Sequence, residues 1–153
     1  MIYQAGKYPV LEAILHTSAT PGDWWRGKSG EDVLKAFWDW HVNDNGWRKV
    51  GYHRVVMPDG EVLHDQRYLR SLYEVGAHVA ERNRGTVGIC MVPVKTVDRM
   101  GEFSDFYTMA QKMAVREYLK DLKGLTDLKW VTGHNDYANK LCPGFKVKTG
   151  DWL

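Results

Sequence analysis

The sequence predicts one α/β domain over residues 1–153, with a central mixed β-sheet flanked by helices. Three observations support the prediction of a single globular domain of this fold class. Short apolar runs alternate along the chain with amphipathic segments of helical period, which is typical of helices packed on a sheet. The length suits one domain with a real core. The composition, with 44% hydrophobic and 26% charged residues, is that of a globular protein without repeats or linkers.

The first half of the chain predicts a strand followed by a helix. The segment "VLEAILHTSAT", Val10–Thr20, has an unbroken apolar centre that fits a strand covered on both faces, with His16 at its exit. The loop "TPGDWWRGKSG" follows, identified by its proline and glycines. Ser29, with Asp32 three residues later, predicts the capping box of a helix that ends within Asn43–Gly46.

Three further segments predict strands. "VGYHRVVMPDGEVLHD", Val50–Asp65, has two β-rich runs around Pro58–Gly60, which is a turn sequence, so we expect a hairpin. Gly85–Val94 and Leu128–Gly133 predict buried strands, and His134 lies just beyond the second of them.

A second helix is predicted between Ser104, as its N-cap, and Gly124, as its stop. Its apolar positions recur at helical spacing, and we assign Met109 and Met113 to its core-facing side.

The totals exclude several classes of protein. A net charge of +2 is too small to indicate a nucleic-acid partner. Two cysteines cannot form a disulfide framework. No signal peptide opens the chain, and no apolar run approaches the roughly 18 residues of a membrane span. We therefore expect a protein made in a cytoplasm, without membrane insertion.

Two histidines and one cysteine carry the chemistry. His16 and His134 stand at the ends of two predicted strands, and Cys142 follows on a loop. Two imidazoles and one thiolate form a known catalytic zinc set, in which water takes the fourth position. Two alternatives stay open at this point: Cys142 as a nucleophile with His134 as its base, or a closed structural zinc site in which Cys90 is the fourth ligand.

Four segments, in order, carry a resemblance to a known family. They are "AILHTSAT", "VGYHRVVMPDGEV", "GAHVAERNRGTVGICMV" and "GHNDYANKLCPGF". The chain resembles the zinc-dependent N-acetylmuramoyl-L-alanine amidases of the type-2 superfamily, which includes bacteriophage lysozymes of the amidase type and peptidoglycan recognition proteins. The resemblance covers nearly the whole chain, from about Val10 onward.

The resemblance implies one zinc ion per chain, bound by His16, His134 and Cys142. It also implies that Tyr52 and Lys140 are catalytic. A phenol and an ammonium group aimed at the oxyanion of the tetrahedral intermediate would stabilise it electrostatically.

The same family pattern implies that His78 and Asn83 bind substrate. The sequence departs from the pattern in this segment, because Val79 and Glu81 stand where the family usually has alanine and glycine. The Trp24–Trp25 loop is also more aromatic than in typical phage members, either as a carbohydrate-stacking rim or as a packed loop.

The implied function is hydrolysis of the amide bond between N-acetylmuramic acid and L-alanine in peptidoglycan. We expect a monomeric phage or prophage endolysin, made in the host cytoplasm and released to the wall by a separate holin-type protein. The alternatives are a cytoplasmic muropeptide-recycling amidase, which more often has aspartate in place of Cys142, and a peptidoglycan-binding protein without activity.

Overall fold

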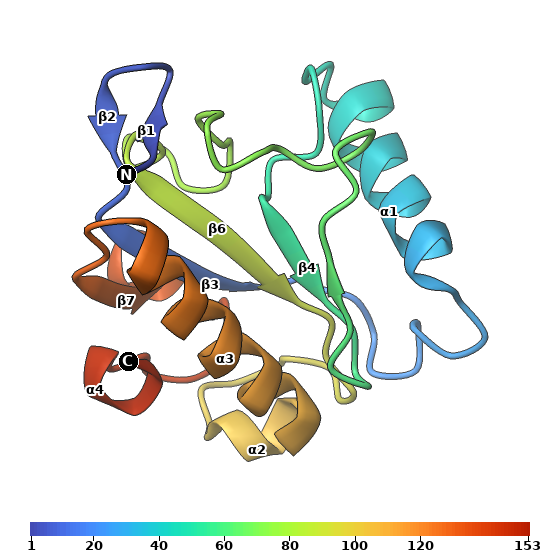
Figure 1. The fold of residues 1–153 in the computed structure, drawn as a ribbon. Coiled ribbons are helices and arrows are strands. Elements are labelled where there is room, and N and C mark those ends of the chain that lie inside the picture. Colours follow the sequence, from blue (N-terminus) through green and yellow to red (C-terminus); the bar gives the residue numbers. More distant parts are fainter.

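The computed structural model describes all residues, 1–153, and its centre is a five-stranded mixed sheet (Figure 1). The strand order is β5 (Val62–Leu63), β4 (Arg54–Val56), β6 (Thr86–Met91), β3 (Glu12–Thr17) and β7 (Trp130–Gly133). The pairings of β4, β6, β3 and β7 are parallel, and β5 pairs antiparallel with β4. A small separate hairpin joins β1 (Tyr3–Gln4) to β2 (Tyr8–Pro9). The predicted fold class is confirmed.

The register of the parallel strands determines where polar side chains collect. In β3, His16 pairs with Cys90 of β6, and Leu15 pairs with Gly133, the last residue of β7. His134 therefore leaves the sheet directly beside His16. The carboxyl ends of parallel strands meet at one edge of the sheet, which is where α/β proteins place their sites.

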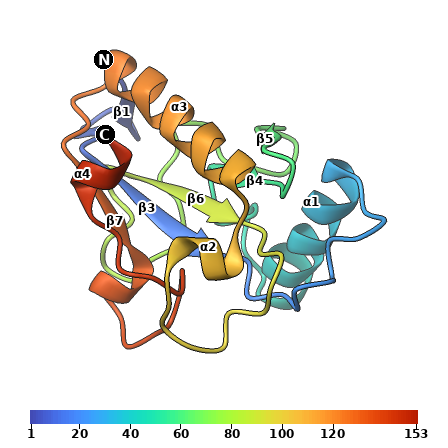
Figure 2. The same ribbon diagram turned by 90° about the horizontal axis from the view of Figure 1, so that it is seen from below.

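Helices cover both faces of the sheet. The long helix α3 (Met109–Leu125) crosses one face, over an 18-residue cluster that includes Leu15 and Ile89 (Figures 1 and 2). On the other face, α1 (Gly30–Trp38) packs beside β4 on a 10-residue cluster that includes Val55. Side chains alternate between the faces along each strand, so His16 faces away from α3, which packs against Leu15.

The start of α1 is confirmed. Ser29 Oγ accepts from the Asp32 N–H at 3.1 Å, and Asp32 Oδ2 accepts from the Ser29 N–H at 2.9 Å, which is the expected capping box. The helix continues as one π-helical segment, η1 (Asp39–Asp44), and stops in the predicted region.

The prediction of the second helix is wrong about its start, its end and its core-facing side. It is two helices, α2 (Phe103–Phe106) and α3, and Ser104 lies inside the first. Thr108 is the N-cap of α3, because its hydroxyl accepts from the Gln111 N–H and closes a second capping box.

The helix also ends at Leu125, one residue beyond Gly124. Met109 and Met113 are 67% and 65% exposed, so they are surface residues and not core. The core-facing position between them is occupied by a polar residue, Gln111, which is fully buried.

The remaining elements close the fold. A short 3-10 turn, η2 (His134–Asp136), follows β7, and a last helical turn, α4 (Thr149–Trp152), lies near the chain end. None of the helices combines the length and apolar character that crossing a membrane requires.

Candidate metal centre

Three potential metal ligands converge at the edge of the sheet. The ligand atoms of His16, His134 and Cys142 all lie within 4.8 Å of one another, and Cys142 Sγ is 3.8 Å from His16 Nδ1. His16 comes from the end of β3, His134 opens η2, and Cys142 lies on the loop before α4. The two imidazole nitrogens and the thiol are donors that suit a zinc ion.

The loop that carries Cys142 is fixed by neighbouring segments. Cys142 Sγ accepts from the Thr17 N–H at 3.2 Å, and its carbonyl oxygen accepts from the Asn135 N–H at 2.8 Å. The buried Tyr107 hydroxyl donates to the Pro143 carbonyl oxygen at 2.7 Å. The sequence did not indicate roles for Asn135 and Tyr107, because these roles depend on partners that only the fold brings close.

Burial controls the protonation of the group. It raises the pKa of the Cys142 thiol to about 11, against the opposing effects of the Thr17 N–H and the Lys140 charge. Burial, followed by the charges of His134 and Lys140, lowers the pKa of His16 well below its usual value. The neutral imidazole is the form that binds a metal, and a metal ion would displace the thiol proton.

These observations weigh against the two other uses of Cys142. A buried thiol with a raised pKa and no helix N-terminus beside it is a poor nucleophile. Cys90 lies outside the group of potential ligands and is fully buried in the core beneath α1.

Tyr52 and Lys140 both lie near this group. The Tyr52 ring centre is 5.1 Å from that of His16. Burial raises the Tyr52 pKa well above its usual value, so the phenol is a neutral hydrogen-bond donor. The preceding Gly51 N–H donates to His41 Nδ1 at 3.0 Å, which fixes the backbone next to Tyr52. Lys140 is solvent-exposed on the loop before Cys142.

Two cavities border the group on either side. One, of about 350 Å³, is lined by residues that include His134 and Asn83. The other, of about 320 Å³, is lined by residues that include Thr17 and Cys142. Lys140 lines both cavities.

The structure places His78 and Asn83 in one loop beside the first cavity. Asn83 Oδ1 accepts from the backbone N–H groups of His78 and Val79, at 2.9 Å each, so it shapes the loop. His78 is only 8% exposed, and its ring nitrogens lie against His16 and Thr86. Glu81, at the position of the family's glycine, has a φ of 65°, a conformation that favours glycine.

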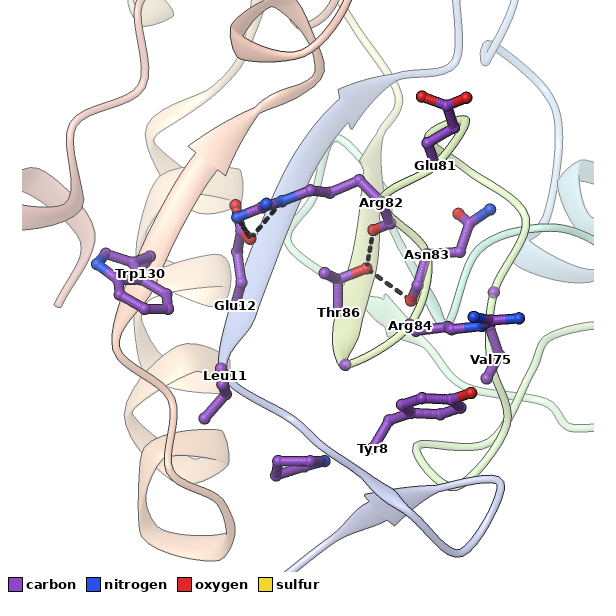
Figure 3. Close-up of a pocket in the computed structure, with 13 residues that line it drawn as sticks. Tyr8, Leu11, Glu12, Val75, Glu81, Arg82, Asn83, Arg84, Thr86 and Trp130 are labelled. Atoms are coloured by element: carbon purple, nitrogen blue, oxygen red, sulfur yellow. Dashed lines mark hydrogen bonds and ion pairs between the residues drawn. The ribbon is translucent and has the colours of Figure 1, made fainter.

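A buried carboxylate ties this loop to the turn after β7. Glu12 accepts from Arg82 Nη2 at 2.9 Å, and also from the hydroxyls of Thr132 and Tyr137. Figure 3 shows Arg82 reaching across to Glu12 at the rim of a third cavity, of about 690 Å³. This network was missed, although an acidic residue inside the buried run "VLEAILH" is a signal that could have indicated it.

The Trp24–Trp25 loop is packed against the protein. The Trp24 ring stacks on Phe37 of α1 with centres 6.3 Å apart, and Trp25 Nε1 donates to the Gly22 carbonyl oxygen at 3.0 Å. Both indoles are partly buried against the core under α1.

Two histidines and a cysteine that converge at the edge of an α/β sheet, beside two cavities, are typical of a catalytic metal site in an enzyme. The family model described as N-acetylmuramoyl-L-alanine amidase matches residues 7–145, and the chain belongs to this family. The family assignment made from the four segments is thus confirmed, and the protein is an N-acetylmuramoyl-L-alanine amidase similar to phage endolysins.

Individual relatives agree with this assignment. The endolysin of Enterobacteria phage T3 is 32% identical over 139 residues, which cover 90% of this chain and 83% of the relative. The endolysin of Escherichia phage T7 is 30% identical over 135 residues, covering 88% and 80%. Bumblebee PGRP-SA superposes with a TM-score of 0.72 at 20% identity, over 98% of this chain and 83% of that one, and shares the fold.

Proposed function

We propose that the protein holds one zinc ion at His16, His134 and Cys142 and acts as a phage or prophage endolysin. The bond cleaved joins the lactyl group of N-acetylmuramic acid to the L-alanine of the stem peptide. The observation that carries this proposal is the convergence of three ligand atoms within 4.8 Å, between two cavities that share Lys140.

Hydrolysis adds one water across the C–N bond and gives a lactyl carboxylate and a free amino group on L-alanine. When bound, zinc supplies an activated water and a Lewis acid for the scissile carbonyl. The chain itself supplies charge stabilisation. The Lys140 ammonium group and the neutral Tyr52 hydroxyl are the donors available to an oxyanion that forms beside His16.

Substrate contacts fall to the loop that borders the first cavity. Asn83 Oδ1 is engaged by two backbone N–H groups, which leaves its amide nitrogen to donate to a substrate carbonyl. His78 offers the edge of its ring to the same cavity.

We assign the whole of residues 1–153 to one catalytic domain that works as a monomer. Made in the host cytoplasm, it would reach peptidoglycan after a holin-type protein opens the membrane. The similarity to phage endolysins favours this role over muropeptide recycling. The retained Cys142, Tyr52 and Lys140 argue against a binding-only protein.

The test combines zinc content with hydrolysis of purified peptidoglycan, followed by the release of amino groups. Cys142→Ala should lose zinc. Lys140→Met and Tyr52→Phe should keep zinc but lower turnover by about 10²–10³, the typical effect of one lost oxyanion donor. Lys148→Met, an exposed lysine on the same C-terminal segment, is the matched control and should behave as wild type.

Several results would contradict the proposal. One is the absence of stoichiometric zinc from wild-type protein purified without chelator, and another is a wild-type rate of turnover in Lys140→Met. Activity that resists a chelator but is abolished by a thiol alkylator would indicate that Cys142 is a nucleophile and not a metal ligand. Cleavage of soluble muropeptides but not of polymeric cell walls would favour recycling over lysis.

A further inference from the structure

A chain of hydrogen bonds runs from the metal centre into the sheet. His16 Nε2 lies 2.9 Å from His78 Nδ1, and His78 Nε2 lies 3.1 Å from Thr86 Oγ1. Thr86 Oγ1 lies 2.9 Å from the Arg82 carbonyl oxygen and 3.0 Å from that of Asn83, as the dashed lines in Figure 3 show. All three side chains in the chain of hydrogen bonds are buried.

The hydrogen bonds of the Thr86 hydroxyl determine which nitrogen of His78, and then of His16, carries the proton. A carbonyl oxygen only accepts, so the single hydroxyl hydrogen of Thr86 points to Arg82 and Asn83. No other group of the protein donates to the Arg82 carbonyl oxygen, which favours this orientation of the hydroxyl. Thr86 Oγ1 must then accept a hydrogen bond from His78, so His78 carries its proton on Nε2.

The same reasoning extends to the ligand. A neutral imidazole has one N–H, so His78 Nδ1 is unprotonated and accepts from His16 Nε2–H. His16 Nδ1 is left with a free lone pair. This is the nitrogen that faces Cys142 Sγ at 3.8 Å, inside the group of ligand atoms.

The surrounding backbone holds His78 in this position. A Cβ at Gly88 would lie 2.6 Å from His78 Cγ, and one at Gly76 would lie 2.7 Å from His78 Cδ2, so glycine at both sites lets the ring pack close. Asn83 Oδ1 fixes the backbone N–H of His78 at 2.9 Å. With both nitrogens engaged, the ring is oriented toward His16 and not toward solvent.

We propose that His78 and Thr86 are positioning residues that hold His16 in its Nε2–H tautomer and so present Nδ1 to the metal. Hydrogen-bond partners of this kind usually fix the tautomer of a ligand histidine, and their loss typically weakens metal binding by about 10- to 100-fold. The proposal rests on the metal role proposed for His16. It also assigns the two His78 nitrogens to the protein and leaves only its ring edge for substrate.

The first test reads the tautomers directly, in zinc-free protein, by ¹⁵N NMR of the imidazole rings. His16 and His78 should both show protonated Nε2 and unprotonated Nδ1. A His16 protonated on Nδ1 would overturn the proposal. Because no metal is present, this result is independent of whether wild-type protein binds zinc, which is the test of the proposed function.

The second test measures zinc affinity by competition with a chelator. Thr86→Val removes the hydroxyl at nearly constant shape, and zinc should bind about 10- to 100-fold more weakly. Thr126→Val is the matched control. Thr126 is also buried and its hydroxyl donates to the Leu122 carbonyl oxygen at 2.8 Å, but it lies at the end of α3, outside the chain of hydrogen bonds.

Two substitutions of His78 separate positioning from filling space. In His78→Asn the side-chain oxygen can take the place of Nδ1 and accept from His16, so most of the zinc affinity should remain. His78→Leu fills a similar volume without an acceptor and should lose that affinity. Equal zinc affinity in both variants, or wild-type affinity in Thr86→Val, would refute the proposal, and Thr86→Val decides the matter if His78→Leu fails to fold.

Discussion

Replacing Glu12 by glutamine tests the network that joins the two sides of the site. The Glu12 side chain is 3% exposed and accepts hydrogen bonds from Arg82, Thr132 and Tyr137. Glutamine keeps the shape but replaces one acceptor oxygen by an NH₂ group. The new NH₂ group then faces N–H or O–H donors of the network instead of accepting a hydrogen bond from them.

The size of the effect follows from the exposure of the partners. Arg82 is 46% exposed, so its guanidinium group regains water and its ion pair contributes little. The hydroxyls of Thr132 and Tyr137 share the other carboxylate oxygen. Hydrogen bonds to a charged group contribute about 1.5–3 kcal/mol. We therefore expect the free energy of unfolding to fall by about 2–3 kcal/mol, and Tm by roughly 4–12 °C for a domain of this size.

Thermal unfolding of zinc-free protein, followed by circular dichroism, measures this effect. Glu81→Gln is the control, because Glu81 is exposed on the loop that carries Arg82, and a surface change of this kind stays within about 0.5 kcal/mol. A Tm for Glu12→Gln close to that of wild type and of the control would show that the network does not stabilise the fold.

Two further predictions concern strain and protonation. Because Glu81 has a φ of 65°, Glu81→Gly should be more stable than Glu81→Ala by about 0.5–1 kcal/mol in urea titrations, and equal stability would contradict the strain. Burial lowers the pKa of His53 to about 4, and the folded state therefore binds fewer protons than the unfolded state below about pH 6.5. The contribution of His53 to the free energy of unfolding should be fully retained above about pH 6.5 and fall by up to about 3 kcal/mol as the pH drops toward about 4, and His41, whose pKa burial also lowers to about 4, adds a loss in the same direction. In zinc-free protein, His53→Gln should flatten this pH dependence, and an unchanged slope would assign it to other groups.

Local patterns were sufficient for most of the sheet but not for α3. The buried strands β3 and β6 have continuous apolar runs, and such runs are a direct signal of two covered faces. The start of α3 was missed because Ser104 and Thr108 both suit an N-cap, and tertiary contacts decide between them. Two extended residues, Tyr107 and Thr108, separate α2 from α3, and the Tyr107 hydroxyl is hydrogen-bonded to the Pro143 carbonyl oxygen.

The error over Met109 and Met113 has a similar cause. Gln111 is buried because its amide donates to the carbonyl oxygens of Val56 and Val92, at 3.2 and 2.7 Å, near the ends of two strands. A hydrophobicity pattern treats glutamine as a surface residue, so the predicted face of the helix was rotated away from the true one.

The site was predictable where a residue's role depends on its own segment. His16 and His134 could be placed because each stands at the end of a recognisable strand. Glu12, Asn135 and Thr86 could not, because their roles depend on partners that the fold brings close: Glu12 is 70 residues from Arg82 and 125 from Tyr137. The family resemblance supplied the proposed ligands and the proposed catalytic pair, but not the hydrogen bonds around them.

Those hydrogen bonds also indicate what kind of metal centre this is. His16 is anchored by the sheet and by His78, and Cys142 by the Thr17 and Asn135 N–H groups. The core clusters, of 18 and 10 buried hydrophobic residues, form on the two faces of the sheet. Small structural zinc domains differ, because they lack a core of this size and the metal drives their folding. Ligands that are held in place by hydrogen bonds to the fold can leave one coordination position for chemistry, as catalytic zinc sites do.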